Sequence, residues 1–165
     1  MDINKLIIRT IVFFAGDAKR VQHFIKVHSF AKLIAEIEGL KETELNTLEA
    51  AAVVHDVGIK PAEAKFGRCD GKLQEQEGPV VARPLLIECG ATDEQIERIC
   101  FLISHHHTYC NINSLDYQIL VEADFLVNIY EDGIPSDEIS TIRERIFRTK
   151  TGKSLIDKCY QTFFI

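Results

Sequence analysis

Apolar residues recur at helical spacing along most of the chain, and the clearest stripe lies between Asp17 and Gly39. Asp17 is a typical helix N-cap, and Gly39 is a typical helix stop. Between them, apolar positions three and four residues apart form one face of an amphipathic helix. These positions are Val27, Phe30, Ala31, Ile34 and Ala35. The pattern predicts a helix that ends at about Glu38.

A second helix is predicted to begin at Thr43 or Glu44 and to run through the apolar residues up to Val54. Gly58 and then Pro61 end it, and the stretch 59–72 contains this proline and two glycines. Such a cluster of glycine and proline is typical of turns. We therefore expect residues 59–72 to form a connecting loop, which could close over a ligand or simply join two helices.

Further helices are predicted in the second half of the chain. Pro84 lies inside the apolar stretch Pro79–Glu88, where it should kink the helix or delay its start. Thr92 and Gln95 have the spacing of a capping box, and Ser114 opens another apolar periodic segment. No segment shows the clean alternation of a strand, so the predicted fold class is all-α, a single helical bundle.

The C-terminal part is expected to form two shorter helices, after Ser136 and after Gly152, packed on the rest of the bundle. Residues 141–165 carry six basic and two acidic residues. We expect a solvated amphipathic helix there rather than a nucleic-acid contact. The apolar end 163–165 could dock on the body of the protein or form a homodimer contact.

Length and charge narrow the classes of function. The 165 residues predict one domain over residues 1–165, and 46% of them are apolar, which suffices for a sizeable core. The formal charge of −6 argues against a nucleic-acid partner.

The apolar run Leu6–Gly16 is interrupted by Arg9 and is shorter than the ~20 residues of a spanning helix, so no membrane contact is expected. The five cysteines form no CxxC pair, which fits a reducing compartment. Together with the absence of a signal-peptide pattern, this predicts a cytoplasmic protein.

Polar residues interrupt the predicted apolar faces at four places. The first is the pair His55-Asp56, which directly follows the apolar run ending at Val54. Burying an imidazole and a carboxylate is strongly unfavourable unless each finds a partner. The pair could therefore be hydrogen-bonded within the core or hold a cation.

Asp124 is the second of these residues, and it shares the buried face of its predicted helix with Leu120 and Val127. A carboxylate on that face needs a partner, for which a helix N-terminus or an arginine would also serve. Glu122, two residues earlier, is expected on the solvent side of the same helix.

Histidines supply the remaining two places. His23 extends the inward stripe of the first predicted helix, although a single histidine on an apolar face is more often a satisfied core residue. His105, His106 and His107 end an apolar helix and are half of the six histidines in the chain. Imidazole suits Mn, Fe, Co, Ni and Zn, and carboxylates share such sites. The combination favours a shared metal site over separate structural roles.

Taken together, these segments resemble the HD-domain superfamily of metal-dependent phosphohydrolases. That family has a first His, an adjacent His-Asp pair and a distant Asp on separate helices. The matching segments here are Arg20–Val27, Ala51–Gly58 and Glu122–Asp124, and the similarity covers about residues 17–130. The resemblance implies an all-α fold of five or more helices with the metal site between them.

The resemblance implies that His23, His55, Asp56 and Asp124 are the ligands of one divalent ion. The sequence does not distinguish Mn, Fe, Co, Ni, Zn and Mg. Neighbouring side chains on a helix diverge by about 100°, so His55 and Asp56 cannot approach an ion from the same direction. This suits a carboxylate that reaches around the ion or bridges two ions.

Some HD families bind a second ion, and parts of their pattern are present. His106 and His107, with His105 beside them, resemble the later histidine element, whereas Glu77 stands where those relatives carry an earlier histidine. Glu77 could ligate a metal, act as a base or be exposed. The GYP tripeptide of cyclic-di-GMP phosphodiesterases is absent at 108–111, which argues against that substrate.

The implied activity is hydrolysis of a phosphomonoester or phosphodiester, in a nucleotide or related small phosphate. His106, Asp56 and Lys60 are the expected catalytic residues, and Lys60 and Arg20 are expected to contact substrate phosphates. Two other functions remain open. One is a metal-containing nucleotide-binding or regulatory module without turnover, and the other is a metal-free structural domain.

Overall fold

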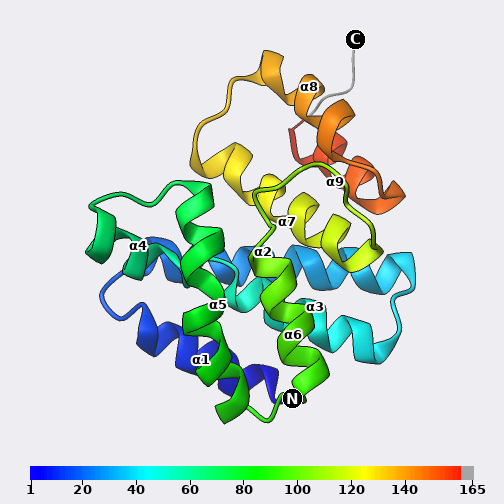
Figure 1. Cartoon of the computed structure of the whole chain (residues 1–165). Coiled ribbons are helices and arrows are strands. Elements are labelled where there is room, and N and C mark those ends of the chain that lie inside the picture. Colours follow the sequence, from blue (N-terminus) through cyan, green and yellow to red (C-terminus); the bar gives the residue numbers. More distant parts are fainter. Residues whose placement is uncertain (161–165) are drawn as a thin grey trace.

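The structure is a computed structural model that describes residues 1–160, and within that range it consists of nine α-helices and no strand (Figure 1). The helices are α1 (Ile3–Phe13), α2 (Ala18–Glu38), α3 (Glu42–Val54), α4 (Ile59–Phe66), α5 (Gly71–Glu88), α6 (Asp93–Ile103), α7 (Leu115–Glu131), α8 (Ser136–Ile146) and α9 (Lys150–Tyr160). The predicted all-α fold class is confirmed.

Helices α2, α3 and α7 form the centre of the bundle, with α2 packed along both others. Helix α1 packs on α3 and α5 at one end, and the α8–α9 pair packs on α7 at the other end (Figure 1). Helix α3 contacts α1, α2, α6 and α7, and its residues Ala50, Ala51 and Ala52 are fully buried. The second half of α3 is buried on all sides, as the core position of an apolar helical segment requires. The chain therefore carries His55 and Asp56, which follow α3, into the middle of the bundle.

The predicted helix signals are present in the structure. Asp17 Oδ1 accepts a hydrogen bond from the Arg20 backbone N at 3.1 Å, and Gly39 ends α2 with a φ of 80°, a left-handed conformation that favours glycine. Thr92 and Gln95 form a reciprocal capping box at the start of α6. These local hydrogen bonds fix where α2 and α6 begin.

The predicted loop at 59–72 is wrong in its first half, because residues Ile59–Phe66 form α4. Pro61 is the third residue of this helix. A backbone N–H in the first turn has no acceptor within the helix, so proline loses nothing there. The proline therefore marks the start of a helix instead of breaking one.

The expected effect of Pro84 on the start of α5 is also wrong, since α5 begins at Gly71 and contains both Pro79 and Pro84. Pro84 removes the donor that would bond the carbonyl of Val80. Val80 is 71% exposed, so water can bond that carbonyl instead. The solvent-facing position of this turn makes the proline tolerable.

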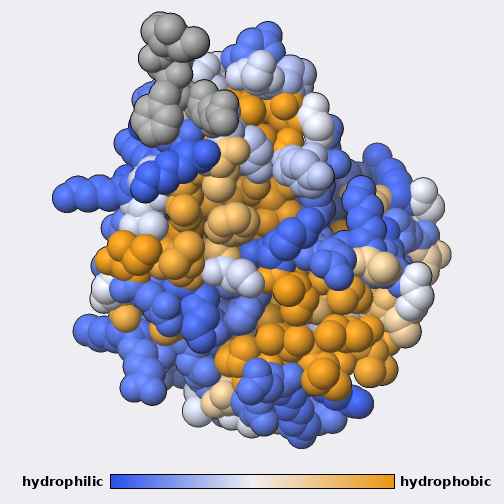
Figure 2. All heavy atoms as spheres, turned by 180° about the vertical axis from the view of Figure 1, so that it is seen from behind, coloured by the Kyte–Doolittle hydropathy of each residue, from blue (hydrophilic) through white to orange (hydrophobic). Residues whose placement is uncertain are grey.

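The apolar N-terminal run forms α1, a helix that the pattern analysis did not single out. Asp2 Oδ1 caps it by accepting from the Lys5 backbone N at 2.9 Å. Its outer side leaves Ile8 and Val12 about 60% exposed, and apolar side chains gather on the rear face of the molecule (Figure 2). Across residues 1–160, none of the helices combines the length and apolar character that crossing a membrane requires.

Glu122 contradicts its predicted solvent position, because it is fully buried between α7 and the C-terminal helices. Its carboxylate accepts hydrogen bonds from the backbone N atoms of Arg148 and Thr149 and from the Thr149 hydroxyl. A Cβ on Gly152 would lie 2.0 Å from Glu122 Oε2, so only glycine fits there. The carboxylate is buried because it satisfies the free N–H groups where α9 begins. The apolar end at 163–165 lies outside the described residues.

Candidate metal centre

Four side chains from separate parts of the chain meet in the middle of the bundle. His23 comes from α2, His55 and Asp56 follow α3, and Asp124 comes from α7. His23 Nε2 lies 3.1 Å from His55 Nε2, 3.2 Å from Asp124 Oδ1 and 3.4 Å from Asp56 Oδ2. His55 Nε2 lies 3.5 Å from Asp56 Oδ2 and 3.6 Å from Asp124 Oδ1. The structure thus brings together the four residues that the sequence pattern grouped.

These spacings match the edges of a metal coordination shell. Ligands at about 2.0–2.2 Å from a divalent ion, at angles between octahedral and tetrahedral, lie roughly 3.0–3.6 Å from one another. Two imidazoles and two carboxylates are a donor set that divalent transition metals accept. His23, His55 and Asp56 are therefore spaced as ligands of one ion, and Asp124 Oδ1 lies at ligand spacing from both histidines.

Two adjacent residues at the end of α3 reach the same centre. The helix ends at Val54 and residues 55–58 form a turn in which His55 keeps helical backbone angles, and His55 Nε2 lies 3.5 Å from Asp56 Oδ2. Gly58 makes the turn fit, because a Cβ there would lie 2.4 Å from the backbone oxygen of Gln74 in α5. The turn is thus held against the backbone of α5.

Hydrogen bonds on the far side of each ring orient the two histidines. His55 Nδ1 donates to the Ala52 carbonyl at 2.8 Å, and His23 Nδ1 donates to Glu131 Oε2 at 2.9 Å. Because a carbonyl and an ionised carboxylate only accept, each Nδ1 carries a proton, so in the neutral form of each ring Nε2 turns a lone pair to the centre. At 3.1 Å the two Nε2 atoms need a proton or a metal ion between them.

Two buried atoms of the site lack a hydrogen-bond partner among residues 1–160. They are Asp124 Oδ1 and His106 Nε2. His106 is fully buried, and its Nδ1 donates to the Ile103 carbonyl at 2.7 Å, which leaves Nε2 as an acceptor 3.6 Å from Asp56 Oδ1. Buried polar atoms are rarely left unsatisfied. A cation would satisfy both atoms, so the residues present fit a metal ion.

Asp56 also belongs to a second group of donors. One donor atom from each of Asp56, His106 and His107 lies within 4.8 Å of the others. Asp56 turns Oδ2 to His23 and Oδ1 to His106, so its carboxylate lies between the two groups. This is the position from which one carboxylate can bridge two ions.

The charges of the site depend on one another. Burial would raise the pKa of Asp124, but the imidazoles of His23 and His55 beside its carboxylate hold that pKa well below the usual range. Burial would lower the pKa of His23, but Asp124 and the charge of Asp56 raise it to about 9. The two ionised carboxylates require positive charge beside them, and a protonated histidine or a divalent cation can supply it.

His107 differs from His23 in its protonation. Burial and the neighbouring His106 lower the pKa of His107 to about 4, so its imidazole is neutral at pH 7. Its Nε2 donates to Gln74 Oε1 at 3.0 Å, and its Nδ1 accepts from the Tyr109 hydroxyl at 3.3 Å.

Sequence reasoning missed two residues that support the histidines. Gln74 lies four residues before Gly78 in α5, and Glu131 is the last residue of α7. Neither follows a pattern that would set it apart from other polar helix residues. Only the packing of α5 and α7 brings Gln74 to His107 and Glu131 to His23.

Two expected members of the second group have other contacts. Glu77 is 5% exposed, and its carboxylate pairs with Lys65. His105 Nδ1 bonds to the Phe101 carbonyl at 2.7 Å, and its ring stacks on that of Phe101. Neither belongs to the groups of mutually close ligand atoms among the described residues, which are His23, His55 and Asp56, and Asp56, His106 and His107; Asp124 lies beside the first group through its contacts with His23 and His55.

The two expected phosphate contacts are also bonded within the protein. Lys60 Nζ donates to the Phe13 carbonyl at 2.7 Å. Arg20 pairs with Asp17 at 2.8 Å and with Glu63 at 2.6 Å. Of the two, Arg20 is the better placed, because it lies one helical turn before His23 on α2.

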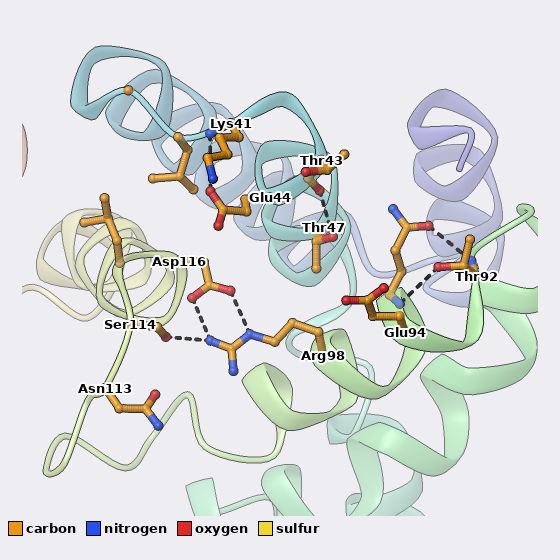
Figure 3. A pocket seen from close by; sticks show the side chains of 14 residues that line it. Lys41, Thr43, Glu44, Thr47, Thr92, Glu94, Arg98, Asn113, Ser114 and Asp116 are labelled. Atoms are coloured by element: carbon orange, nitrogen blue, oxygen red, sulfur yellow. Dashed lines mark hydrogen bonds and ion pairs between the residues drawn. The ribbon is translucent and has the colours of Figure 1, made fainter.

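A pocket of about 850 Å³ lies at the opposite ends of α3 and α6 from the metal centre (Figure 3). Thr47 lines it, and His55 follows eight residues later, on the order of 12 Å along the helix axis. The guanidinium of Arg98 is held by both oxygens of Asp116, at 2.7 and 2.8 Å, and by the Ser114 hydroxyl. The charge of Arg98 is thus already balanced within the pocket.

The family comparison agrees with the geometry. The family model for the HD domain matches residues 20–145, which include His23, His55, Asp56 and Asp124. No curated protein and no solved structure gives a significant match.

Proposed function

The chain belongs to the HD-domain family, which is a family of metal-dependent phosphohydrolases, and on that basis we propose that it hydrolyses a phosphate ester. One observation carries the proposal. His23 Nε2 and His55 Nε2 lie 3.1 Å apart, each lies 3.2–3.6 Å from a carboxylate oxygen of Asp56 and of Asp124, and Asp124 Oδ1 is buried without a hydrogen bond among residues 1–160.

His23, His55, Asp56 and Asp124 would hold the first divalent cation. His106 and His107, with Asp56, are the residues that would hold a second one. A bound divalent cation lowers the pKa of coordinated water and offsets the negative charge of a phosphoryl oxygen.

The protein residues contribute position and proton transfer. Glu131 and the Ala52 carbonyl fix the rings of His23 and His55. The Ile103 carbonyl fixes His106 with an accepting Nε2 beside Asp56. That nitrogen is placed to accept a proton from an attacking water or to bind a second cation. Such fixed groups accelerate hydrolysis because they need no rearrangement during the reaction.

The substrate is proposed to be a nucleotide or a related small phosphate ester. Arg20 lies one helical turn before His23 and would contact a substrate phosphate after giving up its ion pair with Glu63. The Glu63 side chain is only half-buried, so this pair can be given up. Lys60 would have to leave the Phe13 carbonyl to do the same. We therefore assign the larger part in phosphate binding to Arg20.

One observation favours a second function, a nucleotide-binding module without turnover. Glu77 takes the place of a histidine found in relatives with two metal ions, and its charge is balanced by Lys65. The second group then has three protein donors within the described residues. If a second ion is needed for hydrolysis and does not bind, the centre would bind a phosphate without cleaving it.

Phosphate release tests the proposal. Protein reconstituted with Mn²⁺, Fe²⁺, Co²⁺ or Zn²⁺ is incubated with p-nitrophenyl phosphate, bis-p-nitrophenyl phosphate and a nucleotide panel. We expect metal-dependent turnover that is lost in Asp56→Asn and kept in Asp132→Asn, a matched change at an exposed position. Tight nucleotide binding without product would favour the binding module. Turnover that Asp56→Asn leaves intact would contradict the proposed site.

A further inference from the structure

A second pocket, of about 320 Å³, is lined in part by Tyr109, which contacts His107. It is formed by the loop after α6, by α7 and by the end of α8, and its polar lining includes Tyr109, Gln118, Arg145 and Arg148. Its volume lies at the lower end of the range for small-molecule sites.

Tyr109 connects this pocket to the metal centre. Its hydroxyl donates to His107 Nδ1 at 3.3 Å. Its ring packs edge-on against Phe125, the residue after Asp124, with ring centroids 5.1 Å apart. One side chain therefore lines the pocket and contacts the second group of metal donors.

Within residues 1–160, neither arginine side chain of the pocket is paired with a carboxylate. The side chain of Arg145 makes no hydrogen bond or ion pair in that range, and it is exposed. The guanidinium of Arg148 bonds only to backbone carbonyls, those of Glu144, Arg145 and Phe147. The formal charge of the whole chain is −6, so two unbalanced arginines in one pocket stand out from their surroundings.

Partly buried hydrogen bonds attach the backbone that carries the arginines to α7. Glu122 accepts from the backbone N of Arg148 at 2.6 Å, and Gln118 Nε2 donates to the Ile146 carbonyl at 2.8 Å. Both Glu122 and Gln118 lie on α7, the helix that also carries Asp124. The segment that presents the arginines is thus attached to the helix that presents a metal donor, and a ligand finds it already in place.

We propose that Arg145 and Arg148 form an anion subsite that binds a second phosphate of the substrate while the first lies at the metal centre. Tyr109 joins the two sites, because it lines the pocket and its hydroxyl bonds His107. A nucleoside with phosphates at both ends of its sugar has one phosphate for each site, whereas a nucleoside monophosphate has no second phosphate.

The groups between the two ends suit a nucleoside. The ring of Tyr109 offers an apolar face. The NH₂ of Gln118 is used by Glu122 and the Ile146 carbonyl, so its oxygen has no hydrogen bond within the described chain and can accept one from a sugar hydroxyl or a base. The identity of the ester that is cleaved rests on the proposed function. The binding of the second phosphate at the arginines does not depend on it.

Calorimetry on the full metal-loaded chain tests the subsite. The probes are AMP and adenosine 3′,5′-bisphosphate, which differ by one phosphate. We expect the bisphosphate to bind about tenfold more tightly than AMP, as for one charge-assisted contact. The preference should vanish in Arg145→Gln/Arg148→Gln, with the Kd for AMP unchanged. Arg145→Gln alone should reduce it, and this variant breaks no hydrogen bond in residues 1–160.

Lys158→Gln is the matched control, because it removes one exposed positive charge from the same end of the chain outside the pocket. Lys158→Gln should keep the full preference for the bisphosphate over AMP. The subsite is overturned if the wild-type protein binds both probes equally or binds neither. It is also overturned if the preference survives in the double variant, or if Lys158→Gln removes it equally. Phosphate release is followed in the same samples, so that a failure of the proposed hydrolysis is seen separately from a failure of the subsite.

Discussion

His23 and His55 hold their Nε2 atoms 3.1 Å apart in the core of the bundle, with the Nδ1 of each ring donating to an acceptor behind it. Two imidazole lone pairs at this distance repel each other unless positive charge lies between them. Asp56 and Asp124 add two buried carboxylates to the same centre. This arrangement is unfavourable by itself and becomes favourable when it binds a cation, so metal binding and stability should be coupled.

Removal of the metal should therefore lower the thermal stability. At a metal concentration about a hundredfold above Kd, binding stabilises a fold by ~2.7 kcal/mol, which corresponds to a shift in Tm of roughly 5–10 °C for a chain of this size. Differential scanning calorimetry with and without a chelator measures the shift. The variant Asp124→Asn should show a much smaller response, and an equal Tm with and without chelator in the wild-type protein would contradict the coupling.

Glu131 should support metal binding although it does not reach the centre. Its carboxylate accepts the Nδ1 proton of His23 and also pairs with Lys26, and partners of this kind change metal affinity about 10- to 100-fold. Glu131→Ala should weaken binding by such a factor in a competition assay with a chromophoric chelator.

Two matched variants separate the positioning role of Glu131 from its charge. Glu131→Gln keeps an acceptor for His23 and should recover most of the affinity. Lys26→Met removes only the second partner and should have little effect. Unchanged affinity in Glu131→Ala would contradict the positioning role.

Gly152→Ala should destabilise the protein, because the new Cβ would meet Glu122 Oε2 at 2.0 Å. Overpacking of this kind is destabilising by about 1–3 kcal/mol, against a gain of up to ~1 kcal/mol from helix propensity. Gly78→Ala is the control, since its Cβ would lie 3.6 Å from Ile103 in ordinary contact. Urea unfolding should show a lower midpoint for Gly152→Ala only, and equal midpoints in the two variants would contradict the close packing of Glu122.

Stability in acid should depend on the pair Arg98–Asp116. Burial would raise the pKa of Asp116, but hydrogen bonds from Arg98 and Ser114 lower it below its ordinary value of 3.8. A group with a depressed pKa in the folded state contributes stability above its unfolded pKa and loses it as the pH falls through the folded pKa. The free energy of unfolding should therefore fall below about pH 4.

Urea unfolding between pH 7 and pH 3 measures this dependence. In Arg98→Gln the free energy of unfolding should fall less steeply with pH than in the wild-type protein, because the pKa of Asp116 then moves back towards its unfolded value. Arg83→Gln removes an exposed ion pair with Glu97 and should leave the pH dependence nearly unchanged, since water screens that pair. An identical pH dependence in Arg98→Gln and the wild-type protein would rule out this contribution.

The sequence predicted the helices whose ends carry local signals. Asp17, Gly39 and the Thr92–Gln95 box act on the backbone next to them, so the pattern alone locates α2 and α6. Helix α4 was missed because Pro61 was interpreted as a breaker, although in the first turn it has no effect on helical hydrogen bonds. The rule that proline ends a helix therefore predicts a helix end correctly only when the position of the proline within the helix is known.

The clustered residues could be grouped from the sequence because each is a polar residue on an otherwise apolar face. The residues that support the histidines could not be predicted from the sequence, because the contact between Glu131 and His23 spans 108 positions in the chain. Glu122 was misplaced for a related reason, as its partners lie in the segment before α9. Three consecutive histidines also point in different directions in a turn, and only packing shows that His106 faces Asp56 and His105 does not.

The metal content of the freshly purified protein tests the central claim most directly. Elemental analysis by mass spectrometry, normalised to protein, should find at least one divalent transition metal ion per chain. The ion should be lost in Asp124→Asn and retained in Asp132→Asn. A wild-type protein that neither contains nor takes up such an ion, or an Asp124→Asn variant with full metal content, would contradict the assignment of this cluster as a metal centre.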